Sequence, residues 1–320
     1  MVLIFGMTAC SGPMSIMDPA GPGASRVARL WWLIFWISII VMLVVLVLLV
    51  YSLRTRRKTG ANSEGNPEDV PAWGIRFVAI SGFVIPVIVL IVVLGISLFD
   101  LAALGKDQNS QLRIEVTGHM WWWEARYPNG VVTANEIHIP VGEPVEFSLE
   151  TADVIHSFWI PSLFPKKDMI PGRANTLTME ASKPGRYQGI CSEFCGLQHA
   201  NMGMYVVADV NFTEWLANQE LPALKPSSNT TKSGLEVFLG STCIGCHTIR
   251  GTAADSTIGP DLTHVADRET LFAARVDNTR ANLKAIIIDP QGIKPGAAMP
   301  PTTLTDADLE SLLDYLESLR

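Results

Sequence analysis

The sequence predicts a chain of three different parts: a hairpin of two membrane-spanning helices, an all-β sandwich, and an all-α domain at the C-terminal end. Three observations predict them. Two uncharged apolar runs stand near the N-terminus, short alternating apolar and polar runs fill the middle, and leucines recur every three or four residues near the end. Of the 320 residues, 48% are hydrophobic and the mean hydropathy is +0.26, which exceeds what a wholly soluble protein normally shows.

The hairpin is expected over residues 25–108. Residues 30–53 and 77–99 carry no charge, and each run is long enough to cross a bilayer core at 1.5 Å per residue. Pro86 interrupts the second run, as membrane helices tolerate. The basic cluster RTRRK at residues 54–58 lies between the runs. The positive-inside rule therefore predicts a cytoplasmic loop and an extracytoplasmic remainder after Asp100.

The first 24 residues form a leader whose nature the sequence leaves open. The apolar residues before Cys10 resemble a lipoprotein signal that is cleaved ahead of a lipidated cysteine, but they lack the usual positive start. Lipidation at Cys10, a misassigned start and an ordinary N-terminal tail all remain as interpretations.

Three further segments complete the expected organisation. Residues 109–212 hold short runs such as LRIEVTG and PVEFSLE between Pro and Gly turns, which predicts a β-sandwich. The segment NFTEWLANQE at residues 211–220 predicts a short helix, and residues 213–232 become rich in Pro, Ser and Thr, which predicts a linker that tethers the last domain. Residues 233–320 alternate helices with loops, and Thr305 with Asp308 predicts a capping box before the final helix.

The charge balance excludes one class of function. The formal net charge is −7 and the isoelectric point is near 5.4, whereas a nucleic-acid-binding protein presents a basic surface to phosphates. We expect no nucleic-acid partner.

The sequence CIGCH, from Cys243 to His247, has the pattern that attaches haem covalently. The thiols of Cys243 and Cys246 add to the haem vinyl groups, and the adjacent His247 binds the iron. The pattern opens a separate domain, which makes a chance match improbable.

An electron-transfer haem needs a second axial ligand. After Lys232 the chain has one methionine, Met299, in the Gly- and Pro-rich loop KPGAAMPPTTL, and His264 is the competing candidate. We favour Met299, because such a loop suits one face of a haem and is a poor place for a core methionine. The domain resembles a class I cytochrome c, in which a segment matching GPDL (residues 259–262) braces the histidine on the iron.

A second cluster, CSEFCGLQHANM at residues 191–202, indicates a metal site. Zinc would accept Cys191, Cys195 and His199, but a thioether such as that of Met202 is an unusual zinc ligand. Thiolates, imidazole and thioether together favour copper, which a cupredoxin-like sandwich often carries. Two cysteines in one loop predict two bridged copper ions, and such a centre needs a second histidine. His119, His138, His156 and His264 are available outside the loop, and His156 ends a β run.

The segments DVIHSFWIPSL, DMIPGR and GICSEFCGLQHANM closely resemble cytochrome c oxidase subunit II with its dinuclear copper A centre. With the haem domain appended, the chain from Ser25 onward resembles subunit II of a caa-type oxidase. The resemblance implies six copper ligands: the side chains of His156, Cys191, Cys195, His199 and Met202, and the backbone carbonyl of Glu193.

The same resemblance implies two further roles. The Glu193 side chain would reach a magnesium ion at the contact with subunit I, although it reads equally well as a solvated carboxylate. In GHMWWWEARYP, Trp121 would pass electrons to the copper; alternatively, Trp121 and Trp123 simply pack on one side of a strand. The family's common form has a glutamate near the start of the second span. Residues 70–86 contain none, so a proton path through this subunit is in doubt.

The expected function is an electron relay in a respiratory terminal oxidase of the bacterial plasma membrane. A cytochrome c or a quinol-oxidising complex would reduce haem c, haem c would reduce the copper pair, and the pair would reduce a haem in subunit I, where oxygen becomes water. The expected partners are subunit I, other oxidase subunits, the donor and lipid.

Three rival functions are weaker. A copper-free scaffold of a quinol oxidase would lack the ligands, a nitrous oxide reductase would need a large propeller and no hairpin, and a free metallochaperone would not need a haem motif.

Overall fold

The computed structural model describes residues 12–58, 72–105 and 110–320, with the side chains of residues 56–58 left aside. The chain forms two compact units, one of Arg26–Lys106 and one that joins Met1–Ser25 with Asp107–Arg320. Cys10, and with it the question of lipidation, lies outside the described residues, as does the loop of residues 59–71.

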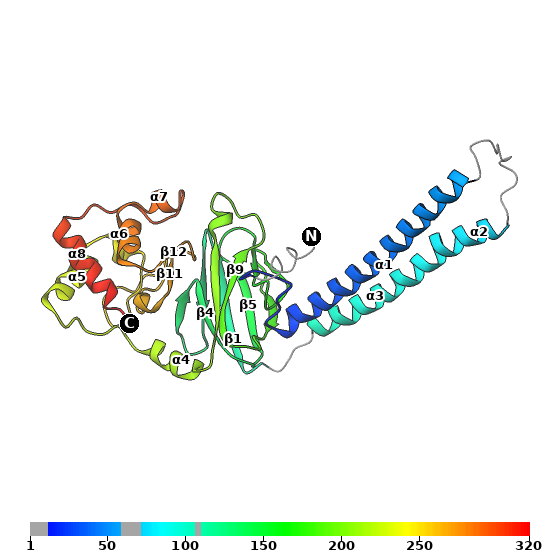
Figure 1. Ribbon diagram of the computed structural model, residues 1–320. Helices are drawn as coiled ribbons and strands as arrows, with labels where there is room; N and C mark the ends of the chain where they lie inside the picture. Colours follow the sequence, from blue (N-terminus) through cyan, green and yellow to red (C-terminus); the bar gives the residue numbers. More distant parts are fainter. Residues whose placement is uncertain (1–11, 59–71, 106–109) are drawn as a thin grey trace. The chain divides into compact units, whose positions relative to one another are not determined.

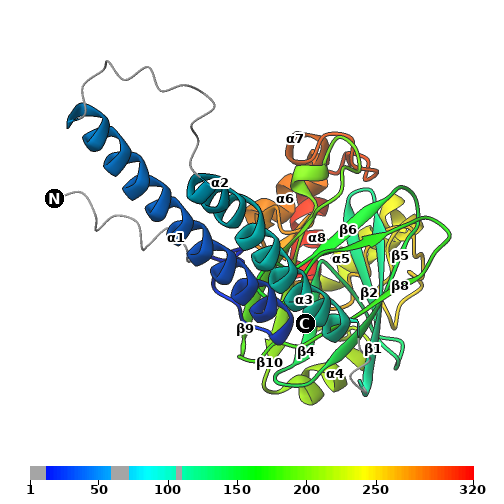
Figure 2. The same ribbon diagram turned by 90° about the vertical axis from the view of Figure 1, so that its right-hand side faces the viewer.

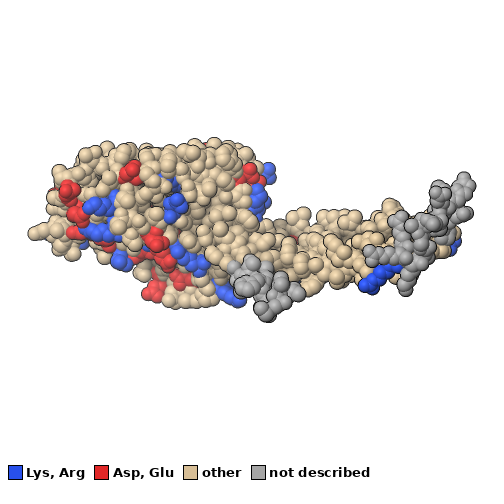
Figure 3. Space-filling model, turned by 45° about the horizontal axis from the view of Figure 1, so that its top comes forward, with Lys and Arg blue, Asp and Glu red and all other residues tan. Residues whose placement is uncertain are grey.

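The first unit is a pair of long apolar helices, which confirms the hairpin predicted from sequence. One helix is α1 (Pro22–Lys58); the other is built from α2 (Ala72–Ala79), a π-helical turn (Ile80–Val84) and α3 (Ile85–Leu104). The windows Pro22–Thr55 and Ala72–Leu104 are long and apolar enough to cross a membrane, and none of their most apolar stretch is buried within the protein. In Figure 3 this part of the surface is almost free of charge between its ends.

Two local features shape this hairpin. Pro86 has no backbone N–H, and the wider π-helical turn precedes it, with the Ile85 N–H reaching the Ile80 carbonyl. Where α1 and α3 run side by side, Arg26 pairs with Asp100 at 3.2 Å (Figure 2). This ion pair joins the N-terminal part of α1 to the C-terminal part of α3.

The middle of the chain folds into two five-stranded sheets that pack face to face (Figure 1). One sheet has the order β3-β2-β1-β5-β8 and the other β4-β10-β9-β6-β7. The strands are β1 (Leu112–His119), β2 (Trp122–Arg126), β3 (Val132–Ala134), β4 (Glu136–Pro140), β5 (Val145–Thr151), β6 (His156–Trp159), β7 (Lys167–Met169), β8 (Asn175–Met179), β9 (Gly185–Cys191) and β10 (Gly203–Asp209). This is the predicted sandwich.

Alternation along the strands builds the core between the sheets. In β10 every second residue is buried, and β1 follows the same rule at Ile114 and Val116. Phe147 and Phe158 meet at a centroid distance of 5.6 Å across the sheets. The thiols of Cys191 and Cys195 belong to this same core, so the packing of the sandwich fixes the metal-binding cluster.

The C-terminal domain is helical, with one short hairpin. Its elements are α5 (Asn229–Gly240), a 3₁₀ turn (Thr242–Gly245), a 3₁₀ turn (Val265–Asp267), β11 (Thr270–Leu271), β12 (Val276–Asp277), α6 (Arg280–Ile288), α7 (Pro290–Ile293) and α8 (Asp306–Glu317). The Thr305 hydroxyl caps α8 by accepting from the Asp308 N–H, as the sequence predicts. Helices α5 and α8 touch at Gly234, where a methyl group would lie 2.0 Å from the Ser311 carbonyl oxygen.

The segment between the two domains is held to the helical domain. It starts with α4 (Phe212–Glu220), and Arg250 then donates to the Glu220 carbonyl at 3.1 Å. The Ala223 N–H donates to the Arg250 carbonyl at 2.9 Å, and α5 begins at Asn229, inside the predicted linker, because Ser228 caps it. The sequence predicts a linker here without deciding its stiffness, and these local hydrogen bonds hold parts of it in place.

Candidate metal and haem sites

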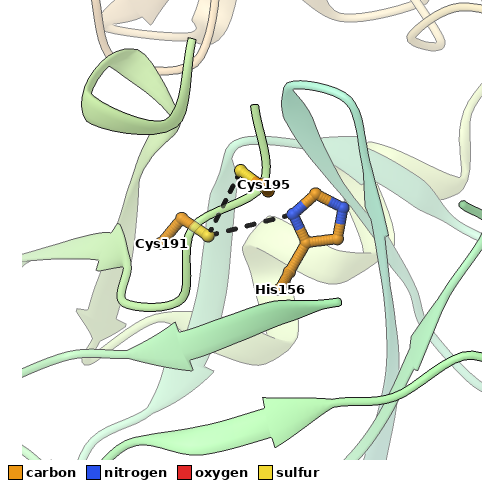
Figure 4. Close-up of side chains that lie close together, drawn as sticks. All are labelled: His156, Cys191 and Cys195. Carbon is orange, nitrogen blue, oxygen red and sulfur yellow. Dashed lines mark hydrogen bonds between the residues drawn. The ribbon is translucent and has the colours of Figure 1, made fainter. Parts of the chain in front are cut away.

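The sulfur and nitrogen atoms of the cysteine-rich loop converge at one end of the sandwich. Cys191 ends β9, His156 begins β6, and Phe158 of β6 pairs with Cys191, so adjacent strands bring the two together across 35 residues of sequence. Figure 4 shows His156, Cys191 and Cys195 pointing at one another. Cys195, His199 and Met202 follow in the loop that leads into β10.

The distances describe a cluster built around two sulfurs. The Cys191 and Cys195 Sγ atoms lie 3.7 Å apart, which is far beyond a disulfide bond, and both thiols are free. His156 Nδ1 lies 3.8 Å from Cys191 Sγ, and His199 Nδ1 lies 3.7 Å from Cys195 Sγ. Met202 Sδ lies 3.8 Å from Cys195 Sγ, and the Glu193 carbonyl oxygen lies 3.2 Å from Cys191 Sγ.

This donor set fits soft metal ions. Two thiols, two imidazoles, one thioether and one carbonyl surround a centre that is almost closed to solvent, since Cys191 and Cys195 are each 3% exposed and Met202 is 1% exposed. The neighbouring Cys195 thiol lowers the pKa of Cys191, and conversely Cys191 raises the pKa of Cys195. The pair therefore gives up one proton readily, while the second thiolate needs a positive charge such as a metal ion.

Asp153 orients the buried imidazole of His156. Its Oδ1 lies 2.8 Å from His156 Nε2, and its Oδ2 accepts from the Met120 N–H at 2.7 Å. Burial works against the charged imidazole, but the hydrogen bonds to Cys191 and Asp153 raise the pKa of His156 overall. With Nε2–H donated to Asp153, Nδ1 is the nitrogen free to bind a metal.

Two tryptophans bind the loop by their indole N–H groups. Trp121 Nε1 donates to the Cys195 carbonyl at 2.8 Å, and Trp123 Nε1 donates to the Met202 carbonyl at 3.4 Å. Trp123 is fully buried and its ring lies 6.0 Å from that of His156, whereas Trp121 lies in the turn before β2. The two side chains are therefore not equivalent: Trp123 is a core residue, whereas Trp121 is partly buried at the edge of the core.

The Glu193 side chain is half exposed and pairs with Lys166 at 3.3 Å. Lys166 also pairs with Asp168 at 3.4 Å. Both arrangements predicted for Glu193, a solvated carboxylate and a carboxylate available to an ion at a subunit contact, are compatible with this position.

The C-terminal domain contains a large apolar cavity around the CIGCH segment. Cys243, Cys246 and His247 line one part and Met299 lines another, with walls formed by Phe238, Leu283, Ile286, Ile287, Leu312 and Leu316. The apolar walls of the cavity suit a flat aromatic macrocycle.

His247 is held in the orientation that an iron ligand needs. Its Nδ1 lies 2.8 Å from the Pro260 carbonyl oxygen, which fixes the proton on Nδ1 and leaves Nε2 to bind iron. A methyl group at Gly259 would lie 2.9 Å from the imidazole, so glycine lets the GPDL segment press against the ring. Burial lowers the pKa of His247 and keeps it neutral.

Met299 and His264 differ in their surroundings. Met299 lines the cavity, and its loop is held by Gln291, whose Nε2 donates to the Ala297 carbonyl at 2.8 Å and to the Met299 carbonyl at 3.1 Å. His264 lies 3.0 Å through Nε2 from the Leu221 carbonyl oxygen and is absent from the residues that line the cavity. This geometry favours Met299 as the second axial ligand.

The haem cavity opens against the sandwich. Met120, Trp121, Trp122 and Asn135 of the sandwich complete its lining. Sequence reasoning identified Trp121 but missed its neighbours in this contact. No sequence motif marks Lys294, Glu136 or Arg186, which also lie at this contact. Asp153 stands three residues before His156 in DVIHSFW, so a search for a partner to that histidine could have found it.

The fold and the two sites define a class of protein: a helical membrane anchor followed by a sandwich with a copper-type ligand cluster and a cytochrome c domain. The family model described as cytochrome C oxidase subunit II, periplasmic domain, matches residues 130–210, and the cytochrome c model matches residues 231–320. Cytochrome c oxidase subunit 2 of Alkalihalophilus pseudofirmus is 34% identical, with 98% of this chain and 94% of that protein covered.

Two further similar proteins are a relative of comparable length and a solved domain. Cytochrome c oxidase subunit 2 of Bacillus subtilis is 30% identical over 98% of this chain and 94% of its own length. The crystal structure of the periplasmic domain of subunit II of cytochrome oxidase of Bradyrhizobium japonicum is 33% identical, with 35% of this chain and 95% of that chain covered and a TM-score of 0.34. The chain belongs to the cytochrome c oxidase subunit 2 family, in a form with a fused cytochrome c domain.

Proposed function

We propose that this chain is the electron-input subunit of a respiratory terminal oxidase. It takes electrons from an external donor, a cytochrome c or a quinol-oxidising complex, through covalently bound haem c. It passes them to a dinuclear copper A centre and from there to the haem of subunit I, where oxygen is reduced to water.

One observation carries this proposal. Trp121 lines the haem cavity and also donates its indole N–H to the Cys195 carbonyl at 2.8 Å. A single side chain therefore connects the cavity around His247 with the sulfur cluster. A structural zinc loop or a stand-alone haem domain would not require this contact.

The residues of the C-terminal domain would hold and orient a haem. Cys243 and Cys246 would attach it covalently, and His247 and Met299 would be its iron ligands. The Pro260 carbonyl sets the tautomer of His247, and Gln291 fixes the Met299 loop. A haem with two protein ligands on its iron would supply electron exchange rather than oxygen binding.

The residues of the sandwich hold the copper ligands in a rigid frame. His156, Cys191, Cys195, His199 and Met202 would bind through their side chains, and Glu193 through its carbonyl. His156 and Cys191 stand on paired strands, and Asp153 and the two indoles fix the surrounding groups. Burial excludes water from the cluster, so little needs to reorganise when the site changes charge.

The remaining assignments follow from the family. The helical hairpin would span the bacterial plasma membrane twice and leave both redox domains on the periplasmic side, in contact with lipid, subunit I and other oxidase subunits. The Glu193 carboxylate would face a magnesium ion at the contact with subunit I. Residues 70–86 contain no glutamate, so we assign no proton path to this subunit.

The test is spectroscopy and rapid kinetics on the full-length chain purified with its oxidase. We expect two copper ions and one haem c per chain, a mixed-valence copper signal in electron paramagnetic resonance, and haem c oxidation concurrent with copper reduction after a flash. The variant Cys195→Ala should keep haem c but lose the copper signal and the transfer of electrons from haem c to copper. Zinc in the loop, or copper reduction that does not follow haem c, would overturn the proposal.

A further inference from the structure

Lys294 is a buried lysine at the contact between the two redox domains. It lies five residues before Met299, it is 3% exposed, and its Nζ donates to the Trp121 carbonyl at 2.6 Å and to the Phe272 carbonyl at 3.3 Å. In the part of the chain that the structure describes, no carboxylate pairs with it. Lysines are rarely buried with carbonyl partners alone, and burial lowers the pKa of Lys294 to about 7.

The second partner of Lys294 belongs to an unusual turn. Phe272, Ala273 and Ala274 follow β11 with φ angles of 60°, 63° and 58°, a left-handed conformation that non-glycine residues rarely adopt in succession. The turn points two carbonyls outward: that of Phe272 accepts from Lys294, and that of Ala273 accepts from the Gly203 N–H at 3.1 Å. Surrounding contacts must hold such a turn in place.

Gly203 makes the close approach possible. It follows the proposed ligand Met202, and a methyl group there would lie 3.1 Å from the Ala273 oxygen and 3.2 Å from Ala274 Cβ. The haem-domain turn thus sits directly on the start of β10. The turn therefore links two places: Gly203, which follows the proposed copper ligand Met202, and the side chain of Lys294.

The loop around Lys294 also touches the copper-binding loop. Gln198 Nε2 donates to the Pro295 carbonyl at 2.8 Å, and Gln198 is itself buried between Leu197 and His199. A methyl group at Gly296 would lie 3.1 Å from Leu197 and 3.5 Å from the ring of Trp121. Residues 294–296 therefore contact both Trp121 and the loop that carries His199.

A buried carboxylate anchors the other side of the same contact. Glu136, at the start of β4, accepts from the Thr270 N–H at 2.9 Å, the Thr270 hydroxyl at 2.8 Å and Arg186 at 2.9 Å. Arg186 also pairs with Glu269 at 2.9 Å and lies over the ring of Tyr205. Buried, charge-assisted bonds of this kind resist salt far better than a surface ion pair.

From these contacts we propose that Lys294 is a positioning residue: it fixes the Met299 loop of the haem domain against Trp121, so that both redox domains work as one docked unit. The proposal rests on the electron-relay function proposed above. Lys294 lines the cavity proposed for haem, and it acts through its hydrogen bond to the Trp121 carbonyl rather than as a ligand of iron or copper. Transfer between the domains then needs no domain motion and proceeds in a single geometry.

The test is the variant Lys294→Met in the full-length oxidase. Methionine has an unbranched side chain of similar length and suits a buried position, but it cannot donate a hydrogen bond. We expect unchanged haem and copper content and haem-to-copper transfer slower by about tenfold at matched driving force, with the potentials of both centres measured in the same variant, because small displacements of positioned groups are costly. Lys284→Met, an exposed lysine on α6, is the matched control and should transfer at the wild-type rate.

A second measurement needs no substitution. In the wild-type oxidase the transfer rate should stay constant as ionic strength and solvent viscosity rise, since no domain has to diffuse. A rate that falls with viscosity, or a Lys294→Met variant that transfers as fast as wild type, would overturn the role of Lys294. If wild-type haem c does not reduce copper at all, the electron-relay function itself fails, and the two failures are thereby distinguishable.

Discussion

The indole N–H of Trp121 donates to the carbonyl of Cys195 at 2.8 Å. This bond spans 74 residues of sequence and ties the wall of the haem cavity to the central sulfur of the metal-binding loop. In the same turn, the Trp121 carbonyl accepts from Lys294. Trp121 is thus held from both domains: its side chain is bonded to the sandwich, and its backbone carbonyl is bonded to the haem domain.

Replacing Trp121 should slow transfer without emptying either site. In Trp121→Phe the ring remains but the bond to the Cys195 carbonyl is lost, so we expect transfer slower by about tenfold with normal haem and copper spectra. Flash-induced kinetics measure the rate of electron transfer from haem c to copper. Trp215→Phe, which changes an indole on α4 away from both sites, serves as the control. Equal rates in the two variants would show that Trp121 is merely a packing residue.

Removing the charge at Asp153 should loosen copper binding. Asn in Asp153→Asn keeps the shape but weakens the bond that orients His156, and loss of such a partner lowers metal affinity by about 10- to 100-fold. Copper content after dialysis against a graded chelator measures the effect, with the exposed Glu150→Gln on β5 as control. Full copper retention by Asp153→Asn would contradict the orienting role.

The thioether of Met202 should tune the copper potential alone. In Met202→Leu the volume is kept while a weak axial ligand is lost, so a redox titration should show a shifted copper potential and an unchanged haem c potential. Met204→Leu, at a buried position two residues further on in β10, should shift neither. Altered haem c reduction in Met202→Leu would argue against two separate sites.

Met299 and His264 can be separated by an external ligand. Met299→Ala should keep the haem attached but open one axial position, so the reduced haem c should bind carbon monoxide. His264→Gln should not, because that imidazole is engaged with the Leu221 carbonyl. Carbon monoxide binding by the His264 variant, and its absence in the Met299 variant, would reverse the assignment.

His138 predicts a pH dependence of stability. Its ring stacks on Trp215 at 4.0 Å, and burial lowers its pKa to about 4 from an ordinary value of 6.5. Between these values the unfolded chain binds a proton that the folded chain does not. Stability is therefore lost as pH falls from 6.5 to 4, by up to about 3 kcal/mol, and the loss is complete below pH 4.

The variant His138→Gln isolates this contribution. Its thermal unfolding temperature should fall less than that of wild type between pH 7 and pH 4.5, whatever constant difference the lost stacking introduces. Parallel pH profiles for the two proteins would show that His138 does not titrate on unfolding.

Motifs and periodicity were sufficient for the parts of the fold that depend on local sequence. Uncharged runs identified the helical hairpin, alternation identified the sandwich, and CIGCH and CSEFCGLQHANM indicated which residues gather around a metal or a haem. Contacts across the chain were harder. His156 could be named through family resemblance, but its partner Asp153 and the bond from Trp123 to the Met202 carbonyl required the packed strands.

By itself, the sequence determined which atoms can bind metal and haem, because ligand chemistry depends on residue type and short spacing. Only the tertiary structure decided how the two sites face each other. Glu136, Arg186, Lys294 and the left-handed turn at Phe272 have no local pattern, since their roles come from burial at a contact between distant segments. A charge that looks ordinary in the sequence becomes an anchor once water is excluded, because its remaining partners include groups on the other domain, such as the Trp121 carbonyl for Lys294 and Glu269 for Arg186.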